Sequence, residues 1–339
     1  METRKVQLSG GTTYTVSLPK SWATEHRIDA GSILRLHPKG NGSLLVESTG
    51  DTNGDGDERT TTVDSGGLDR DGLARTLHAL YIVGVDRIRL VDDTTHSTER
   101  RSTITRLAGR LSGLEVLETT ETEITLRSLL DPGCVSIHKS VLRLKLITLG
   151  MARDAVRAFV TGDRSLADTV IERDDEADKL FAMVTRYFRR SLSNLAVIDK
   201  LDHSRDELFE YYYVARQFER IADHAEKIAR LANEDALADD LDETLSSYAD
   251  RARTIVDHAA DVALSNAHVG MAYDATANRD ALVDEITAFS HELHGRGEPE
   301  EIHRVSLLLD STERTAEYGA NVAEMAVQRT ARQDELPDA

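Results

Sequence analysis

Apolar residues recur every three or four positions from residue 135 to residue 331, and few glycines or prolines interrupt them. This spacing is typical of amphipathic helices, and short polar stretches such as 274–276 divide it. The pattern predicts six helices, over residues 135–161, 163–195, 204–233, 238–268, 274–295 and 300–331. Long helices with short connections predict two three-helix bundles, over residues 135–233 and 238–331, with a tail at 332–339.

The first 131 residues have a different pattern. Residues 1–48 contain short β-rich stretches separated by turn residues, and the Gly- and Asp-rich segment 49–57 is typical of a linker. In residues 58–131, strand-like and helical stretches alternate and end in a strand or hairpin, which predicts a small α/β module of unknown role. Asp92 and Asp93 follow a predicted strand, where we prefer a turn to the alternative of a binding site. The expected fold class is multidomain and mainly α.

The charge separates the N-terminal part from the rest of the chain. The net charge is −19, but residues 1–48 hold six basic and four acidic residues, a net of +2. Only this part is therefore expected to face an anionic partner. Only 8 of the 41 basic residues are Lys, and an acidic surface with little Lys indicates a halophilic protein from a high-salt cytoplasm.

Composition restricts the class of protein. No apolar run approaches the roughly 18 residues of a membrane span, and no signal-peptide pattern follows Met1, so we expect a cytoplasmic protein. The single cysteine, Cys134, excludes an internal disulfide and offers no thiolate metal site.

Two acidic motifs occur twice in the helical part, in the same order. R-D-x-x-[AV]-D is found at 173–178 and 279–284, and E-R-x-A-[DE]-[HY]-[AG]-x-x-[IV]-A at 219–229 and 313–323. Each half of the helical part is therefore interpreted as one copy of a three-helix unit. The repeated carboxylates are Asp174, Asp178, Glu219 and Asp223 in the first copy, and Asp280, Asp284, Glu313 and Glu317 in the second.

The alternative is that these carboxylates belong to an ordinary solvated face. In so acidic a chain, acidic pairs four residues apart occur by chance about ten times, and Arg220, Lys227 and Arg230 could neutralise the first set with weak surface pairs. Matching positions in two repeats favour a metal-binding patch, since Mg²⁺, Mn²⁺ and Fe²⁺ accept several carboxylate oxygens. His224 faces another direction on the helix and is expected to be a surface group or to lie behind the ligands.

The helical part resembles the PhoU family of phosphate-uptake regulators, in "FERIADHAEKIA" and "RDDEADKLF" and in their repeats "STERTAEYGANVAEMA" and "RDALVDEI". The resemblance covers about 135–331 and implies that the eight repeated carboxylates bind multinuclear metal clusters, with Fe, Mn, Mg or Zn as candidate ions. Glu317 replaces the usual Asp, and the run that commonly precedes the signature is missing from 199–212. The second cluster is therefore the weaker expectation.

The first 48 residues resemble the SpoVT/AbrB swapped-hairpin DNA-binding module, in "RKVQLSGGTTYTVSLPKSW", "DAGSILRL" and "GSLLVES". The resemblance implies a homodimer whose hairpins interleave into one β-barrel. It also implies contacts to double-stranded promoter DNA by Arg4, Lys5, Lys20 and Arg27.

Together the two resemblances imply a DNA-binding transcriptional regulator of phosphate uptake and homeostasis, whose bundles couple phosphate status to the DNA-binding dimer. The alternative is an adaptor that binds no DNA and uses its N-terminal hairpins only to dimerise. It would dock on a phosphate transporter ATPase or a sensor kinase, and meet the membrane only through such partners. An enzyme is not expected, because the sequence shows no positioned nucleophile or base and no Gly-rich phosphate loop.

Overall fold

The computed structural model describes residues 3–38, 42, 44–48, 58–93, 95–232, 237, 239–293 and 298–333. It divides into two compact units, Met1–Glu58 and Arg59–Ala339. The predicted linker 49–57, most of the predicted turn at 39–42 and the tail beyond residue 333 lie outside the described residues. Within the described residues, no helix is long and apolar enough to cross a membrane.

The N-terminal unit consists of two short antiparallel pairs and one short helix. β1 (Gln7–Ser9) pairs with β2 (Thr13–Thr15), and Gly10 and Gly11 between them adopt positive φ angles of 66° and 81°. α1 (Lys20–Glu25) follows, and β3 (Leu34–Pro38) pairs with β4 (Leu44–Ser48). The strands predicted from the β-rich stretches are confirmed, but none of the described residues of this unit is buried.

The second unit begins with an α/β module. The strands are β5 (Thr60–Asp64), β6 (Arg87–Val91), β7 (Leu114–Thr119) and β8 (Glu123–Ser128), with α2 (Arg70–Ile82) and α3 (Thr98–Gly109) between them. The sheet order is β5-β6-β8-β7, parallel between β5 and β6 and antiparallel elsewhere. The last predicted stretch is therefore a hairpin, with an irregularity in register between Val116 and Glu118.

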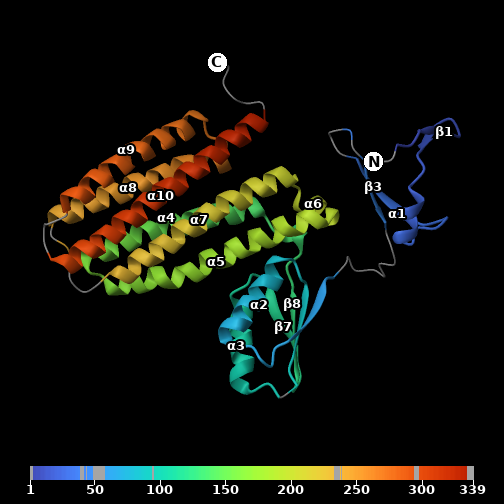
Figure 1. Cartoon of the computed structure of the whole chain (residues 1–339), viewed down its shortest axis with the longest axis horizontal. Coiled ribbons are helices and arrows are strands. Elements are labelled where there is room, and N and C mark those ends of the chain that lie inside the picture. Colours follow the sequence, from blue (N-terminus) through green and yellow to red (C-terminus); the bar gives the residue numbers. More distant parts are fainter. Residues whose placement is uncertain are drawn as a thin grey trace. The chain divides into compact units, whose positions relative to one another are not determined.

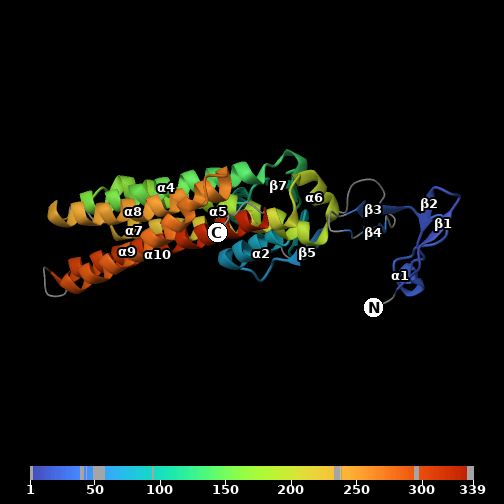
Figure 2. The ribbon, with the colours of Figure 1, turned by 90° about the horizontal axis from the view of Figure 1, so that it is seen from above.

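After the short 3-10 turn η1 (Pro132–Cys134), the chain forms two helical bundles, as the periodicity predicted (Figures 1 and 2). The first bundle packs α4 (Ile137–Thr161), α5 (Arg164–Ser193) and α7 (Arg205–Leu231) together. The second packs α8 (Asp239–Ser265), α9 (Gly270–Leu293) and α10 (Pro299–Arg332) together. α4 packs against α8 and α7 against α10, so one continuous apolar core runs through both bundles.

Local signals set the helix ends. α4 ends at Gly162, whose φ of 70° is the left-handed conformation that glycine adopts most readily at a helix end, and the Asp163 carboxylate caps α5. α7 begins with a capping box, in which Ser204 and Glu207 bond to each other's backbone N–H.

Two helix boundaries differ from the prediction. α6 (Leu195–Leu201) was not expected, and the break between α8 and α9 lies at residues 266–269 instead of 274–276. Asn266 ends α8 with a positive φ of 54°, which Asn tolerates better than most residues. Residues 274–276 continue α9, because Ala275 packs into the core while Asp274 beside it is exposed.

Arg186 of α5 joins the α/β module to the first bundle. Its guanidinium is buried and donates hydrogen bonds to the carbonyl oxygens of Tyr81 (2.7 Å) and Val85 (2.8 Å) and to Asp86 Oδ1 (2.6 Å). Ala182, one helical turn earlier, is part of the module's own apolar core. This position places α2 and α3 beside α5.

Candidate metal centre and nucleic-acid interface

The first set of repeated carboxylates converges between α5 and α7. Asp174 and Asp178 lie one turn apart on α5, and each has a carboxylate oxygen within 4.8 Å of the others and of one from Asp223 on α7. These three residues form the only such group within the described residues. Glu219, one turn before Asp223, lies close enough to contribute to the repulsion between these carboxylates. We call Asp174, Asp178, Glu219 and Asp223 the acidic cluster.

The acidic cluster has fewer hydrogen-bond donors than its charge requires. Among the described residues, Asp174 Oδ1 and Glu219 Oε2 are buried without a hydrogen-bond partner. The other Glu219 oxygen accepts a hydrogen bond from Arg216 Nη1 at 2.9 Å. A buried carboxylate oxygen without a donor is costly unless it is protonated or bound to a cation.

The pKa values of the cluster reflect this shortage. Burial, followed by repulsion from Asp178, raises the pKa of Asp174 to about 7. Burial and Asp223 raise the pKa of Glu219 to about 7 and that of Asp178 to about 6, and burial also raises the pKa of Asp223. By accessible surface, Asp174 and Glu219 are half-buried, whereas Asp178 and Asp223 are exposed. A divalent cation would stabilise carboxylates that are crowded in this way.

Glu226 is a neighbour that the list of repeated carboxylates leaves out. Its charge raises the pKa of Asp174, Asp178 and Asp223, while Arg230 bonds to its Oε1 at 2.5 Å. The signal was visible in the sequence, because Glu226 follows Asp223 by three residues and shares its helix face. His224 points elsewhere and contacts the ring of Tyr318 on α10.

The second set of repeated carboxylates does not converge in the same way. Asp280 is exposed and paired with Arg279, and Asp284 is also exposed. On α10, Glu317 pairs with Arg314, and the pKa of Glu313 is raised by partial burial and by Glu317. The buried side of α9 is formed by apolar residues such as Leu282 and Ile286, so its acidic residues face solvent.

The residues present fit a hard cation in the first half only. All four groups of the acidic cluster offer carboxylate oxygens, the ligands that Mg²⁺, Mn²⁺ and Fe²⁺ accept. Two of those oxygens lack any other partner. In the second half, ion pairs with arginines and contact with solvent already satisfy most of the carboxylates. The second copy of the sequence repeat therefore does not form a second site of this kind.

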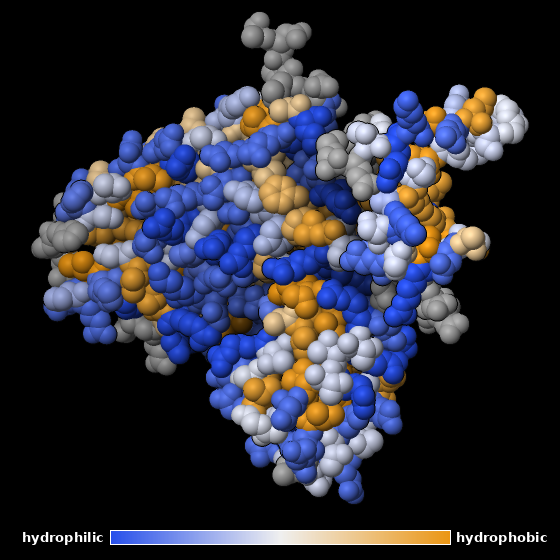
Figure 3. All heavy atoms as spheres, turned by 45° about the vertical axis from the view of Figure 1, so that its right-hand side comes forward, coloured by the Kyte–Doolittle hydropathy of each residue, from blue (hydrophilic) through white to orange (hydrophobic). Residues whose placement is uncertain are grey.

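The basic residues predicted to contact DNA all lie exposed in the N-terminal unit. Arg4 and Lys5 precede β1, Lys20 begins α1, and Arg27 follows it with a positive φ of 53°. The apolar side chains of this unit are exposed as well, and orange atoms show at its surface in Figure 3. Those exposed by half or more are Val6, Leu8, Tyr14, Val16, Ile33, Leu36 and Leu44.

Two family models match the chain. Residues 141–232, which run from α4 through α7, match the PhoU domain model. The chain contains a PhoU domain. Residues 7–53 match the model of the antidote-toxin recognition protein MazE, a bacterial antitoxin.

Solved structures that are similar to the chain include two PhoU proteins. PhoU from Pseudomonas aeruginosa is 18% identical with a TM-score of 0.48, over 58% of this chain and 96% of that one. The phosphate transport system regulatory protein PhoU from Streptococcus pneumoniae is 20% identical with a TM-score of 0.46, over 60% of this chain and 96% of that one. No curated protein matches the chain.

The PhoU domain points to regulation of phosphate homeostasis, and the MazE-like segment is compatible with DNA binding. Both families are regulatory, which agrees with the expectation that the protein is not an enzyme. The acidic cluster lies inside the matched PhoU segment, since its four residues fall between 141 and 232.

Proposed function

We propose that the protein is a dimeric, DNA-binding transcriptional regulator of phosphate uptake, in which a metal-binding PhoU domain and a DNA-binding unit share one chain. The observation that carries the proposal is the lack of a buried core in the N-terminal unit. It matches a MazE-type model, and yet none of its described residues is buried.

Exposed apolar side chains support the dimer. Strands β1 to β4 present Leu8, Tyr14, Leu36 and Leu44 to solvent, with exposed fractions of 51% to 76%. A second copy that interleaves its hairpins would bury these side chains, at about 25 cal/mol for each Å² of apolar surface removed from water. The unit is too small to bury a core of its own, so the homodimer accounts for its sequence.

Charge supports contact with DNA but restricts its kind. Arg4, Lys5, Lys20 and Arg27 are exposed, and a dimer doubles their number. The net charge of +2 on residues 1–48 is modest, and affinity from phosphate contacts falls steeply with salt. At high salt, contacts to base edges or to DNA shape must therefore supply much of the affinity.

The acidic cluster would hold the metal of the PhoU domain. Asp174 and Asp178 from α5 and Glu219 and Asp223 from α7 would supply the ligands, and a bound cation would supply positive charge that neutralises them. The cluster would then bridge two helices of the first bundle. These same residues repel each other without a cation.

Binding to DNA upstream of the protein's own gene or of a phosphate-transporter operon, measured at high salt by fluorescence anisotropy, tests the proposal. We expect Arg4→Ala with Lys5→Ala to weaken binding at least tenfold, because two of the exposed basic groups are lost. Arg70→Ala with Arg106→Ala removes the same charge from α2 and α3 and should leave binding unchanged.

Sedimentation of the same variants controls for folding and dimerisation, since both double variants should remain dimers. Unchanged DNA binding by the Arg4→Ala, Lys5→Ala dimer would show that this face does not contact DNA. The chain would then be better described as an adaptor for a transporter or a kinase.

A further inference from the structure

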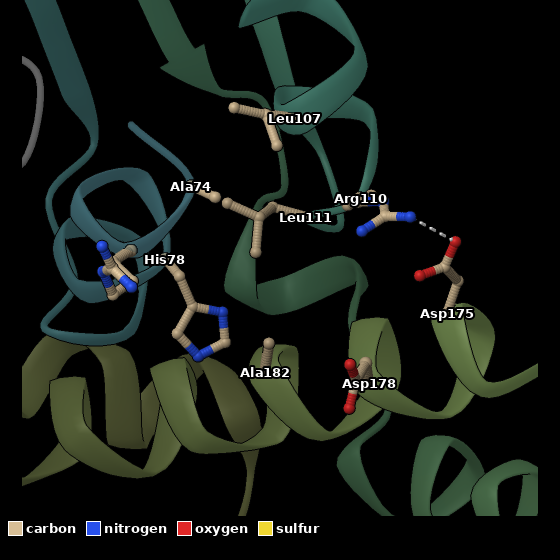
Figure 4. A pocket seen from close by; sticks show the side chains of 9 residues that line it. Ala74, His78, Leu107, Arg110, Leu111, Asp175, Asp178 and Ala182 are labelled. Carbon is tan, nitrogen blue, oxygen red and sulfur yellow. Dashed lines mark hydrogen bonds and ion pairs between the residues drawn. The ribbon is translucent and has the colours of Figure 1, made fainter. Parts of the chain in front are cut away.

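A cavity of about 340 Å³ lies where the α/β module meets the first bundle (Figure 4). Helices α2 and α3 form one side of it and α5 forms the other. Its size falls in the range of small-molecule sites, which begins at about 300 Å³. The function proposed above gives the α/β module no role, whereas a ligand in this cavity would give it one.

The inner surface of the cavity is apolar. It is lined by Ala74 of α2, by Leu107 of α3 and Leu111 just after that helix, and by Ala182 of α5. All of these except Ala74 are buried. In Figure 4, Ala74, Leu107 and Leu111 point toward one another above Ala182. A free phosphate or another small inorganic anion gains nothing from such a surface, whereas a flat apolar ring does.

Polar groups of different kinds surround this surface. α2 contributes Arg75, which has no hydrogen bond or ion pair with the described residues, and His78, whose pKa is lowered by burial. A neutral imidazole can stack on a ring and exchange hydrogen bonds with its edge. An unpaired guanidinium is suited to a phosphate or a carboxylate.

The opposite wall is acidic. α5 contributes Asp175 and Asp178, and Arg110, which follows α3, donates a hydrogen bond from Nη2 to Asp175 Oδ2 at 2.9 Å. Figure 4 places the imidazole of His78 and the carboxylate of Asp178 on either side of Ala182. Carboxylates accept hydrogen bonds from sugar hydroxyls, as acidic residues do in dinucleotide sites.

We propose that this cavity binds a nucleoside monophosphate. Such a molecule combines the three groups that the walls complement: a phosphate for Arg75, a flat base for the apolar surface and His78, and ribose hydroxyls for the carboxylates of α5. The ligand would contact α2, α3 and α5 together, and thereby stiffen the junction between the α/β module and the PhoU domain. The proposal does not depend on DNA binding.

Calorimetric titration of the full chain with AMP and GMP tests the proposal. We expect one nucleotide to bind per chain, and adenosine and inorganic phosphate to bind at least tenfold more weakly than AMP. Arg75→Ala should weaken nucleotide binding about tenfold, while Arg106→Ala, an exposed arginine of α3 outside the cavity, should not. Ala74→Phe, at a half-buried position, should fill the cavity and abolish binding.

Thermal melting of each variant verifies that it is folded, and the nucleotide should raise the melting temperature of the wild type but not of Ala74→Phe. Failure of both nucleotides to bind, or unchanged binding by folded Ala74→Phe, would overturn the proposal. The titration is repeated with and without Mn²⁺. Binding that requires Mn²⁺ and is lost in Asp223→Asn would also overturn it, since the phosphate would then sit on the metal instead of on Arg75.

Discussion

The carboxylates between α5 and α7 make the acidic cluster unstable when it is empty and fully ionised. In the part of the chain that the structure describes, Asp174 Oδ1 and Glu219 Oε2 are buried without donors, while Arg216 donates to the other oxygen of Glu219. A protein that keeps such a group gives up stability unless a proton or a cation occupies it. Near neutral pH, either a bound proton or a bound cation must therefore offset the charge of these oxygens.

Metal content should distinguish the first half of the repeat from the second. We expect Asp174→Asn with Asp178→Asn to lower bound divalent metal to background, because two of the converging carboxylates lose their charge. Asp280→Asn with Asp284→Asn, the matched positions of α9, should change it little, because within the described residues these two carboxylates belong to no such converging group. Elemental analysis of the purified proteins measures the outcome, and equal metal loss in the two variants would contradict it.

The pH dependence of stability follows from the raised pKa values. Asp174 and Glu219 titrate at about 7 in the folded chain and near 4 when unfolded. Their protonated forms therefore stabilise the fold fully below about pH 4, and this contribution is lost as the pH rises through about 7. We expect the metal-free protein to lose stability between about pH 4 and 7, a window set by those pKa values.

Asp174→Asn removes one of the carboxylates that destabilise the fold when they ionise. At the upper end of this pH range, it should stabilise the metal-free protein by about 1–2 kcal/mol, after allowance for solvent screening. Urea unfolding at a series of pH values, with a chelator present, measures it. Added metal should reverse the trend for the wild type, because protons compete with metal for the same oxygens at low pH. A metal-free wild type whose stability is flat or rises over this range would contradict the assignment.

At the scale of elements, the contact between α8 and α10 is unusually close at Gly319. A Cβ placed there would lie 3.0 Å from side-chain atoms of Ile255 and Val256 and 3.1 Å from the backbone N of Val256. Backbone cannot give way as a flexible side chain does. The small residue thus permits the two helices to approach.

Gly319→Ala should therefore lower the free energy of unfolding by about 1–3 kcal/mol, the usual cost of overpacking. Gly109→Ala in α3 is the matched control, because nothing lies within 4 Å of its Cβ position. The control should be neutral or stabilising by up to about 1 kcal/mol, since alanine favours a helix. Denaturant unfolding of both variants checks the pair, and an equally stable Gly319→Ala protein would show that the helices can separate without cost.

Periodicity predicted the elements well where one helix face packs against a core. The apolar stripe of α7, which includes Phe218, Ile221 and Ala225, is buried as expected. Periodicity could not place the turn at Asn266, since a polar stretch such as 274–276 also suits an exposed helix face. It also could not show that α9 turns Asp280 and Asp284 to solvent, because the rotation of a helix about its axis depends on its partners.

The cavity between α2, α3 and α5 could not be predicted from a sequence pattern. Its walls come from α2, α3 and α5, and His78 and Asp178 stand 100 positions apart in the chain. Arg186 joins α5 to the module through hydrogen bonds that it makes while buried. Arginine usually lies at the surface, so its residue type gives no sign of this role. Only the tertiary packing reveals both features.

At the scale of the whole molecule, the N-terminal unit and the second unit differ in how they bury apolar side chains. The unit leaves its apolar side chains exposed, while the second unit has an extensive buried core of its own. A dimer formed through the N-terminal unit would carry two PhoU domains to one DNA site. Regulation then requires that the state of the PhoU domain alters DNA occupancy.

Promoter occupancy in phosphate-replete and phosphate-starved cells, measured by chromatin immunoprecipitation, tests this coupling most directly. The account predicts that occupancy by the wild type changes several-fold with phosphate supply, and that Asp174→Asn with Asp178→Asn abolishes the change while the protein remains dimeric. Occupancy that is the same under both conditions, or a phosphate response that persists in the double variant, would contradict it.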